Sequence, residues 1–126
     1  MAVQPNGDHR SGGCRGEFDP FPDWSEARGS GVVEELSDGR RQVVVDVDTA
    51  AIADMAGKPL REVWLISNDG TALMSIGLLD GTEGRFDVPS NVDLQKYSLV
   101  DVSAEPDNGD PTHSGDSIVR GELKRI

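Results

Sequence analysis

The stretch that decides the fold is VVEELSDGRRQVVVDVD, residues 32–48. Near its end, apolar side chains occupy every second position, at Val43, Val45 and Val47. This period of two places one face of a strand in a core and the other face toward solvent. The Asp38-Gly39 pair between two β-prone runs is a hairpin signal. We therefore expect two antiparallel strands joined by a tight turn.

A second hairpin is expected downstream. The run EVWLIS at 62–67 is strongly β-prone, and NDG at 68–70 is a turn sequence. Residues 72–79 are expected to form the second strand of this hairpin. Small residues in the return strand, Ser75 and Gly77, indicate close packing beneath a large neighbour, for which Trp64 is the candidate.

The rest of the chain continues this pattern of short strands. Runs at 85–88, 98–105 and 118–123 are β-prone, and a polar loop at 106–117 separates the last two. Residues 49–60 are the one helix candidate, although a crossover loop with one helical turn is an alternative. About seven short strands with frequent turns predict an all-β fold, an antiparallel β-sandwich of the Ig-like or Greek-key kind with one short helix or helical turn.

The first 30 residues have a different character. They are rich in glycine and proline and show no apolar period, so they cannot bury enough surface to offset their ordering entropy. We therefore expect a flexible tail or linker over residues 1–30 and one domain over residues 31–126. Three aromatic residues cluster in this tail, Phe18, Phe21 and Trp24. Because they lie outside the predicted core, they are the candidate contacts for a protein partner.

Composition excludes several classes of protein. The chain has 126 residues, enough for one domain, and a net charge of −11, which disfavours binding to nucleic acid or to an anionic membrane. No run approaches the roughly 20 apolar residues of a transmembrane helix. We expect the chain as written to be soluble, without membrane insertion of its own. Cys14 is the only cysteine, so neither an internal disulfide nor a cysteine-rich zinc site can form.

The loop at 106–117 is the one candidate for a cation site. It carries Asp107, Asp110, His113 and Asp116. Carboxylate oxygens suit a divalent cation, but the spacing does not match the calcium-loop pattern. A turn-rich loop whose side chains cap its own amides is the usual meaning of this composition. We therefore expect no metal and no other cofactor.

Catalysis finds little support. Ser114 and Ser117 lie near His113 and Asp116 in sequence, but neighbours in one loop rarely hold the geometry of a triad. Residues 73–77 lack the first glycine of a nucleophile elbow. We expect no catalytic residues, and an enzyme that uses the 106–117 loop remains an alternative.

Three blocks of the sequence resemble the C-terminal domain of anti-sigma-K factors. They are EVWLI at 62–66, SIGLL at 75–79, and a closing signature made of VDVSAEP at 100–106, GDPTHSG at 109–115 and GEL at 121–123. The closing signature is the most specific of the three. With the strand at 43–48 included, the resemblance covers roughly residues 31–123.

The resemblance implies a function. In that family, a cytoplasmic zinc-containing domain binds a sigma factor, one transmembrane helix follows, and this domain lies outside the membrane. Its loss or cleavage is part of signalling by regulated proteolysis. The resemblance thus implies a non-enzymatic, extracytoplasmic sensory or regulatory domain at the bacterial cell membrane that modulates sigma-factor release and transcription indirectly.

The same resemblance implies the partners. They are other segments of a full-length anti-sigma factor or an extracytoplasmic protein, and a sigma factor is reached only through parts that this sequence lacks. The alternative is a β-sandwich that binds a small ligand, a carbohydrate or a cation. Exposed aromatic platforms would favour it, but Trp64 and Phe86 are expected to be internal. The prolines and glycines of the closing signature also suit turn formation, and we expect that role rather than a ligand site.

Overall fold

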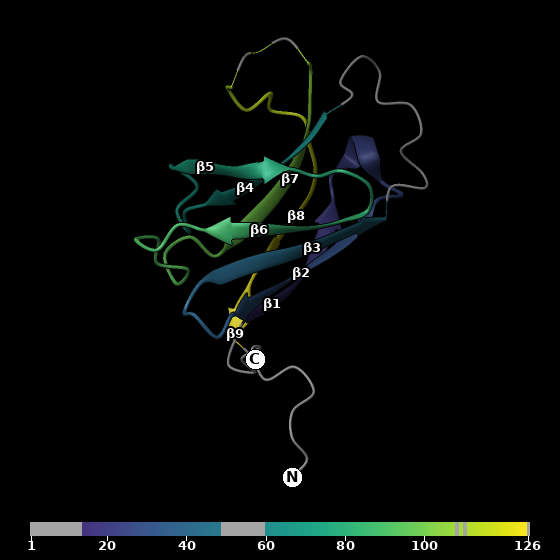
Figure 1. The fold of residues 1–126 in the computed structure, drawn as a ribbon. Helices are drawn as coiled ribbons and strands as arrows, with labels where there is room; N and C mark the ends of the chain where they lie inside the picture. The colour runs from purple at the N-terminus through teal and green to yellow at the C-terminus, as the bar shows by residue number, and fades with distance from the viewer. Residues whose placement is uncertain (1–13, 49–59, 108, 110, 126) are drawn as a thin grey trace.

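The computed structural model describes residues 14–48, 60–107, 109 and 111–125 (Figure 1). Within these residues, nearly all regular structure is β-strand. The elements are β1 (Cys14–Pro20), the 3₁₀ turn η1 (Pro22–Trp24), β2 (Arg28–Glu35), β3 (Arg41–Asp48), β4 (Leu60–Ile66), β5 (Leu73–Leu78), β6 (Glu83–Val88), β7 (Leu99–Glu105), β8 (Ser117–Glu122) and β9 (Lys124–Arg125).

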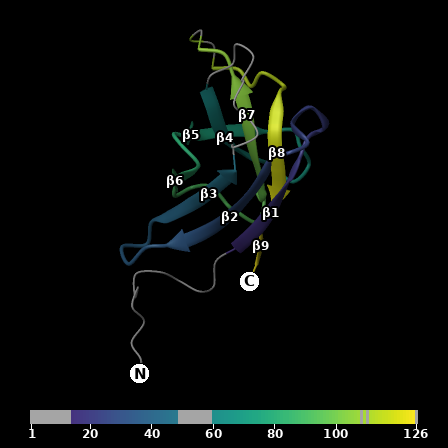
Figure 2. The ribbon, with the colours of Figure 1, turned by 90° about the vertical axis from the view of Figure 1, so that its right-hand side faces the viewer.

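The strands form one antiparallel, nearly closed, barrel-like sheet. Its order is β5-β4-β7-β8-β1-β2-β3-β6, and β9 pairs with β1. Figure 2 shows β8, β1 and β2 running beside one another. The all-β prediction is confirmed, but the seven-stranded sandwich is not. The physical reason is β1, which pairs with β2 along most of its length and with β8 at its end, and so joins what would otherwise be two sheets.

The predicted tail boundary is wrong for residues 14–30. They form β1, η1 and the start of β2, and Phe18 is only 3% exposed in the core. The Phe18 ring lies over Gly29 and Gly31 of β2, where a Cβ at Gly31 would overlap it. Gly29, one of the glycines that suggested a tail, and Gly31 therefore make room for an aromatic ring. Residues 1–13 lie outside the described part of the chain.

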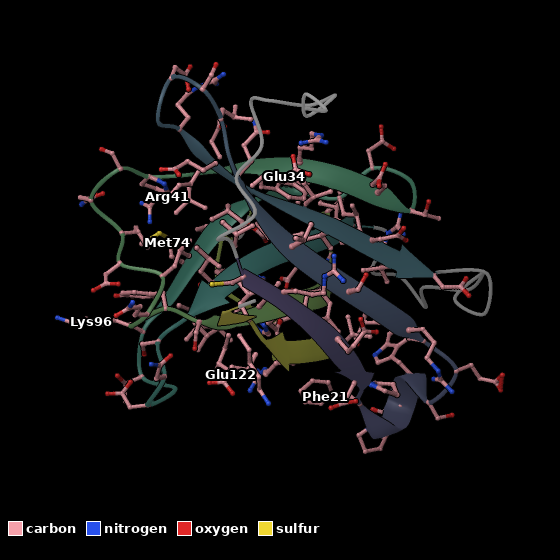
Figure 3. All side chains as sticks on the ribbon, turned by 90° about the horizontal axis from the view of Figure 1, so that it is seen from below. Phe21, Glu34, Arg41, Met74, Lys96 and Glu122 are labelled. Atoms are coloured by element: carbon pink, nitrogen blue, oxygen red, sulfur yellow. The ribbon has the colours of Figure 1, made fainter. Side chains whose placement is uncertain are left out.

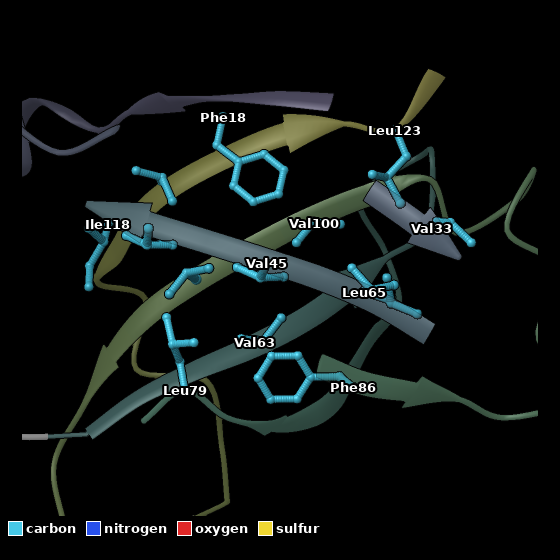
Figure 4. Packing of buried hydrophobic residues seen from close by; sticks show 14 of the residues in the cluster. Phe18, Val33, Val45, Val63, Leu65, Leu79, Phe86, Val100, Ile118 and Leu123 are labelled. Atoms are coloured by element: carbon cyan, nitrogen blue, oxygen red, sulfur yellow. The ribbon is translucent and has the colours of Figure 1, made fainter. Parts of the chain in front are cut away.

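The core is built from the predicted alternation. Val43, Val45 and Val47 are fully buried, and the β2–β3 hairpin has the register Val33↔Val43. Figure 4 shows these strands contributing to one cluster with Phe18, Leu65, Phe86 and others. The apolar side chains of both halves of the barrel thus share a single core.

Glycines occupy the left-handed backbone positions of the two predicted hairpin turns. Gly39 (φ 89°) and Gly70 (φ 77°) adopt left-handed backbone conformations in the two predicted hairpins. Gly77 does make room for a large neighbour, but that neighbour is Phe86 of β6 rather than Trp64. Trp64 and Phe86 are both buried, as predicted.

The helix candidate at 49–60 lies outside the described residues except for Leu60, which begins β4. The helical structure that is described, the three-residue η1, was not predicted. Among the described residues, no helix has the length and apolar character to cross a membrane.

Candidate functional site

A cluster of buried polar side chains lies on the outer face of β7 and β8. In β7, Val100, Val102 and Ala104 point into the core, so alternation directs Asp101, Ser103 and Glu105 outward. Outward residues are usually solvated, yet these three are at most 3% exposed. The segment that follows β7 folds back and hydrogen-bonds to them. The described residues of the loop at 106–117 therefore cover this part of the sheet.

Asp101 is the centre of the cluster. Its side chain is fully buried, and it faces donors from the loop and from β8. His113 Nε2 lies 3.0 Å from Oδ1, while Ser117 Oγ donates to Oδ2 at 2.6 Å. Arg120 donates to the same Oδ2 through Nε and Nη2, each at 2.9 Å. A buried charge needs such partners, so Asp101 ties loop and strand together.

A second chain of hydrogen bonds runs beside it. Trp64 Nε1 of β4 donates to Ser103 Oγ at 2.9 Å, and Ser103 Oγ donates to Glu105 Oε2 at 2.6 Å. The same carboxylate oxygen accepts the backbone N–H of Ser114 at 3.1 Å. Ser114 Oγ donates to the carbonyl of Ala104 at 2.7 Å. The loop is thus fastened to β7 at two further points.

His113 of the loop contacts both Trp64 and Asp101 of the sheet. Its ring lies 4.9 Å from the Trp64 ring, centroid to centroid, at a tilt of 48°. The backbone N–H of Gly115 donates to Nδ1 at 2.8 Å, so Nδ1 is the unprotonated nitrogen and Nε2 carries the hydrogen that Asp101 accepts. The hydrogen bond from Gly115 needs an unprotonated Nδ1 and therefore the neutral imidazole of His113. The Asp101 carboxylate can accept from Nε2 of either the neutral or the protonated imidazole.

The pKa values of this pair shift in opposite directions. Burial alone would raise the pKa of the Asp101 carboxyl, but hydrogen bonds from His113, Ser117 and Arg120 outweigh burial and hold that pKa below its usual value. The hydrogen bond to Asp101 raises the pKa of His113 above its ordinary value, while burial of the ring opposes the rise. Both shifts favour the ion pair.

The described members of the candidate cation site do not come together. His113 faces Asp101, Asp116 Oδ1 accepts a hydrogen bond from Trp24 Nε1 at 2.8 Å, and Asp107 is exposed. Asp110 lies outside the described residues. Among the residues that are described, no group of three or more His, Cys, Asp or Glu side chains could hold a metal ion.

The loop's serines are structural as well. Ser117 Oγ donates to Asp101 and Ser114 Oγ to a backbone carbonyl, and neither bonds to His113. The triad considered from the sequence needs the hydroxyl of Ser114 or Ser117 to bond to the imidazole of His113, and neither serine has that arrangement. Gly109 (φ 78°) and Gly115 (φ 85°) have the left-handed backbone that turns require. Gly109 and Gly115 of the closing signature thus have the turn-forming role that was expected of its glycines.

A second region, the Phe21 groove, lies at the end of β1. It has a volume of about 350 Å³ and opens to solvent. Its lining consists of Asp19, Pro20, Phe21, Pro22, Leu99, Arg120, Gly121 and Glu122. The Arg120 guanidinium lies 5.2 Å from the centroid of the Phe21 ring, within range of a cation–π contact. Figure 3 shows Phe21 and Glu122 on the same lower side of the molecule.

The three aromatic residues predicted as partner contacts have different fates. Phe18 is buried in the core, so that prediction is wrong for this residue. Phe21 is half-buried and lines the groove. Trp24 is also half-buried, and its indole is bonded to Asp116. Sequence reasoning missed Asp101, whose one available signal was an acidic residue at an outward position before a loop that contains histidine.

Comparison with known proteins gives one match. Residues 4–117 match a family model described as the C-terminal domain of anti-sigma-K factor rskA. No curated protein matches the chain. No solved structure matches it either. The family match includes β1 through β7 and the covering loop.

Proposed function

The chain belongs to the family of anti-sigma-K factor C-terminal domains, and from this we propose that it is a non-enzymatic regulatory domain on the extracytoplasmic side of a bacterial membrane-bound anti-sigma factor. The observation that carries the proposal is the family match over residues 4–117. The domain modulates sigma-factor release indirectly, through the other parts of the protein to which it is joined.

The geometry of the polar cluster supports a non-enzymatic role. Its side chains are engaged with one another, with Asp101 accepting from three residues and Glu105 from two. An active site instead holds groups whose hydrogen bonds are completed by a substrate or transition state. The small-ligand alternative loses support because Trp64 is buried and cannot serve as a platform for a sugar ring.

Deletion in a full-length anti-sigma factor tests the regulatory role. Residues 14–125 are replaced by a flexible linker, and transcription from a sigma-dependent promoter is measured with and without the inducing stress. We expect the deletion to change basal or induced transcription. Unchanged transcription in both conditions would show that the domain is a passive tether.

Direct binding is the second test. The isolated chain should not capture a sigma factor at micromolar concentration, because its single cysteine cannot build the zinc-containing site of sigma recognition. Capture at that concentration would contradict an indirect role.

The side of the membrane is tested by cysteine labelling. In the full-length protein, Cys14→Ser removes this domain's only thiol and Ser90→Cys adds an exposed one in the connection after β6. A membrane-impermeant maleimide should label Ser90→Cys in intact cells as completely as in lysed cells. Labelling only after lysis would place the domain in the cytoplasm and overturn this part of the proposal.

A further inference from the structure

We propose that the Phe21 groove is a docking site for an extended peptide segment of a partner protein, one that presents an apolar side chain flanked by lysine or arginine. This inference concerns what the domain binds, and it stands whether or not the domain alters sigma-factor release.

The groove offers an apolar floor that is held in place. Phe21 lies between Pro20 and Pro22, whose rings fix their own backbone angles. The N–H of Phe21 donates to the carbonyl of Ile118 at 2.9 Å, which fastens this turn to β8. Arg120 lies against the aromatic ring. Little conformational entropy remains to be lost on binding, and preorganised aromatic residues of this kind carry much of the energy of protein interfaces.

The shape of the groove suits a peptide. Sites for small molecules enclose most of the ligand surface, whereas this groove opens broadly to solvent and covers one side of whatever lies in it. A neighbouring hollow of about 550 Å³ shares Asp19, Gly121 and Glu122 with it. Together the two hollows follow β1 and β8, and this elongated form matches an extended chain.

The charges select a cationic partner. The lining of the groove contains two exposed carboxylates, Asp19 and Glu122, and one cation. That cation, Arg120, is paired with the buried carboxylate of Asp101 and cannot neutralise them both. The neighbouring hollow adds one carboxylate, Glu17, and two cations, Arg15 and Lys124, so with the two shared carboxylates its lining still has one more negative than positive charge. A lysine or arginine next to the apolar anchor would therefore meet Asp19 and Glu122, at a chain whose net charge of −11 also attracts it.

The test uses a displayed library of random 12-residue peptides, selected on the whole chain. Enriched sequences should share an apolar residue with lysine or arginine beside it. A synthetic peptide with the enriched sequence should bind in a calorimetric titration, and its affinity should fall at least tenfold when salt rises from 50 to 500 mM. A copy with glutamate in place of its basic residues should not bind.

Two groove variants locate the site. Phe21→Ala should reduce the affinity at least tenfold, and Asp19→Lys with Glu122→Lys should do the same without touching the core, since both side chains are exposed. The matched control is Glu35→Lys with Asp80→Lys, which changes the net charge equally at two exposed positions outside the groove. Circular dichroism confirms that each variant is folded.

The inference fails if the selection enriches no sequence or enriches acidic ones. It also fails if the peptide binds the groove double variant and the control double variant with equal affinity, because the attraction is then not located at Asp19 and Glu122.

Discussion

The Asp101 carboxylate should be the polar group whose loss costs this domain most. Asp101→Asn removes the charge and replaces one acceptor oxygen with an NH₂ group, which would face donors on His113, Ser117 and Arg120. The side-chain volume is almost unchanged, so packing is not disturbed. The substitution isolates the electrostatic and hydrogen-bonding role of the carboxylate.

The size of the effect follows from burial. Removing one partner of a buried ion pair costs about 3–5 kcal/mol when the other partner stays buried. Here Asp101 is fully buried and the His113 side chain is 12% exposed, but the Arg120 side chain is 39% exposed and can be solvated in part. We therefore expect a loss of about 2–4 kcal/mol. That is a large share of the roughly 5–15 kcal/mol available to a domain.

Urea denaturation followed by circular dichroism measures this loss. The matched control is Asp87→Asn on β6, where the carboxylate is exposed although it accepts a hydrogen bond from Gln42 at 2.9 Å. The control should cost no more than about 0.5 kcal/mol. A loss below about 1 kcal/mol for Asp101→Asn, or equal losses for the two variants, would refute the reasoning that the carboxylate fastens the loop to the sheet.

Trp64→Ala should lower the free energy of unfolding by about 3–5 kcal/mol in the same assay, because the ring is buried beneath the loop and its N–H is bonded to Ser103; melting like the parent would show that the ring is not part of the packing. Gly121→Ala should cost about 1–3 kcal/mol or more, since its Cβ would overlap the backbone of β1, and an unshifted thermal midpoint would mean that the strands can separate freely. The pKa of His113, measured by NMR, should lie above about 6.5 and fall in Asp101→Asn. Because the folded-state pKa of His113 is raised, the stability that its protonated ring contributes is fully present below about pH 6.5 and is lost as pH rises through the folded pKa. Because the folded-state pKa of Asp101 is lowered, the stability that its carboxylate contributes is present above about pH 4 and is lost as pH falls. Denaturation midpoints that do not change between pH 5 and pH 9 would contradict the His113 contribution.

Much of the barrel could be predicted from sequence because apolar and polar residues alternate clearly along several of its strands. The valines at 43, 45 and 47 gave both the β3 strand and its buried face. Strand β1 was missed because its inward positions are Gly16 and Phe18, and a glycine gives no hydrophobic signal. Gly16 is there because a Cβ would overlap the carbonyl of Glu122, a reason that only the folded pairing reveals.

The polar cluster lay beyond sequence reasoning for a related cause. The alternation in β7 correctly separates Val100 and Val102 from Asp101 and Ser103, and it predicts that the polar pair faces solvent. Whether the outer face of β7 is exposed to solvent depends on whether the loop at 106–117 folds back over it. The loop's histidine was noticed as a candidate ligand, but its partner was in the strand and not in the loop.

The place of β1 in the sheet has a consequence for how the domain folds. This strand is near the start of the sequence, yet its neighbours include β8 and β9, near the end. To form these pairs, the chain must bring together two segments separated by almost its whole length. This loop closure costs conformational entropy before the contacts between the strands can stabilise it. On the ribosome, β1 can pair with β2 early, but the barrel cannot close until residues 117–125 have emerged. Folding should therefore be slow for a domain of this size and should finish only after synthesis of these last strands.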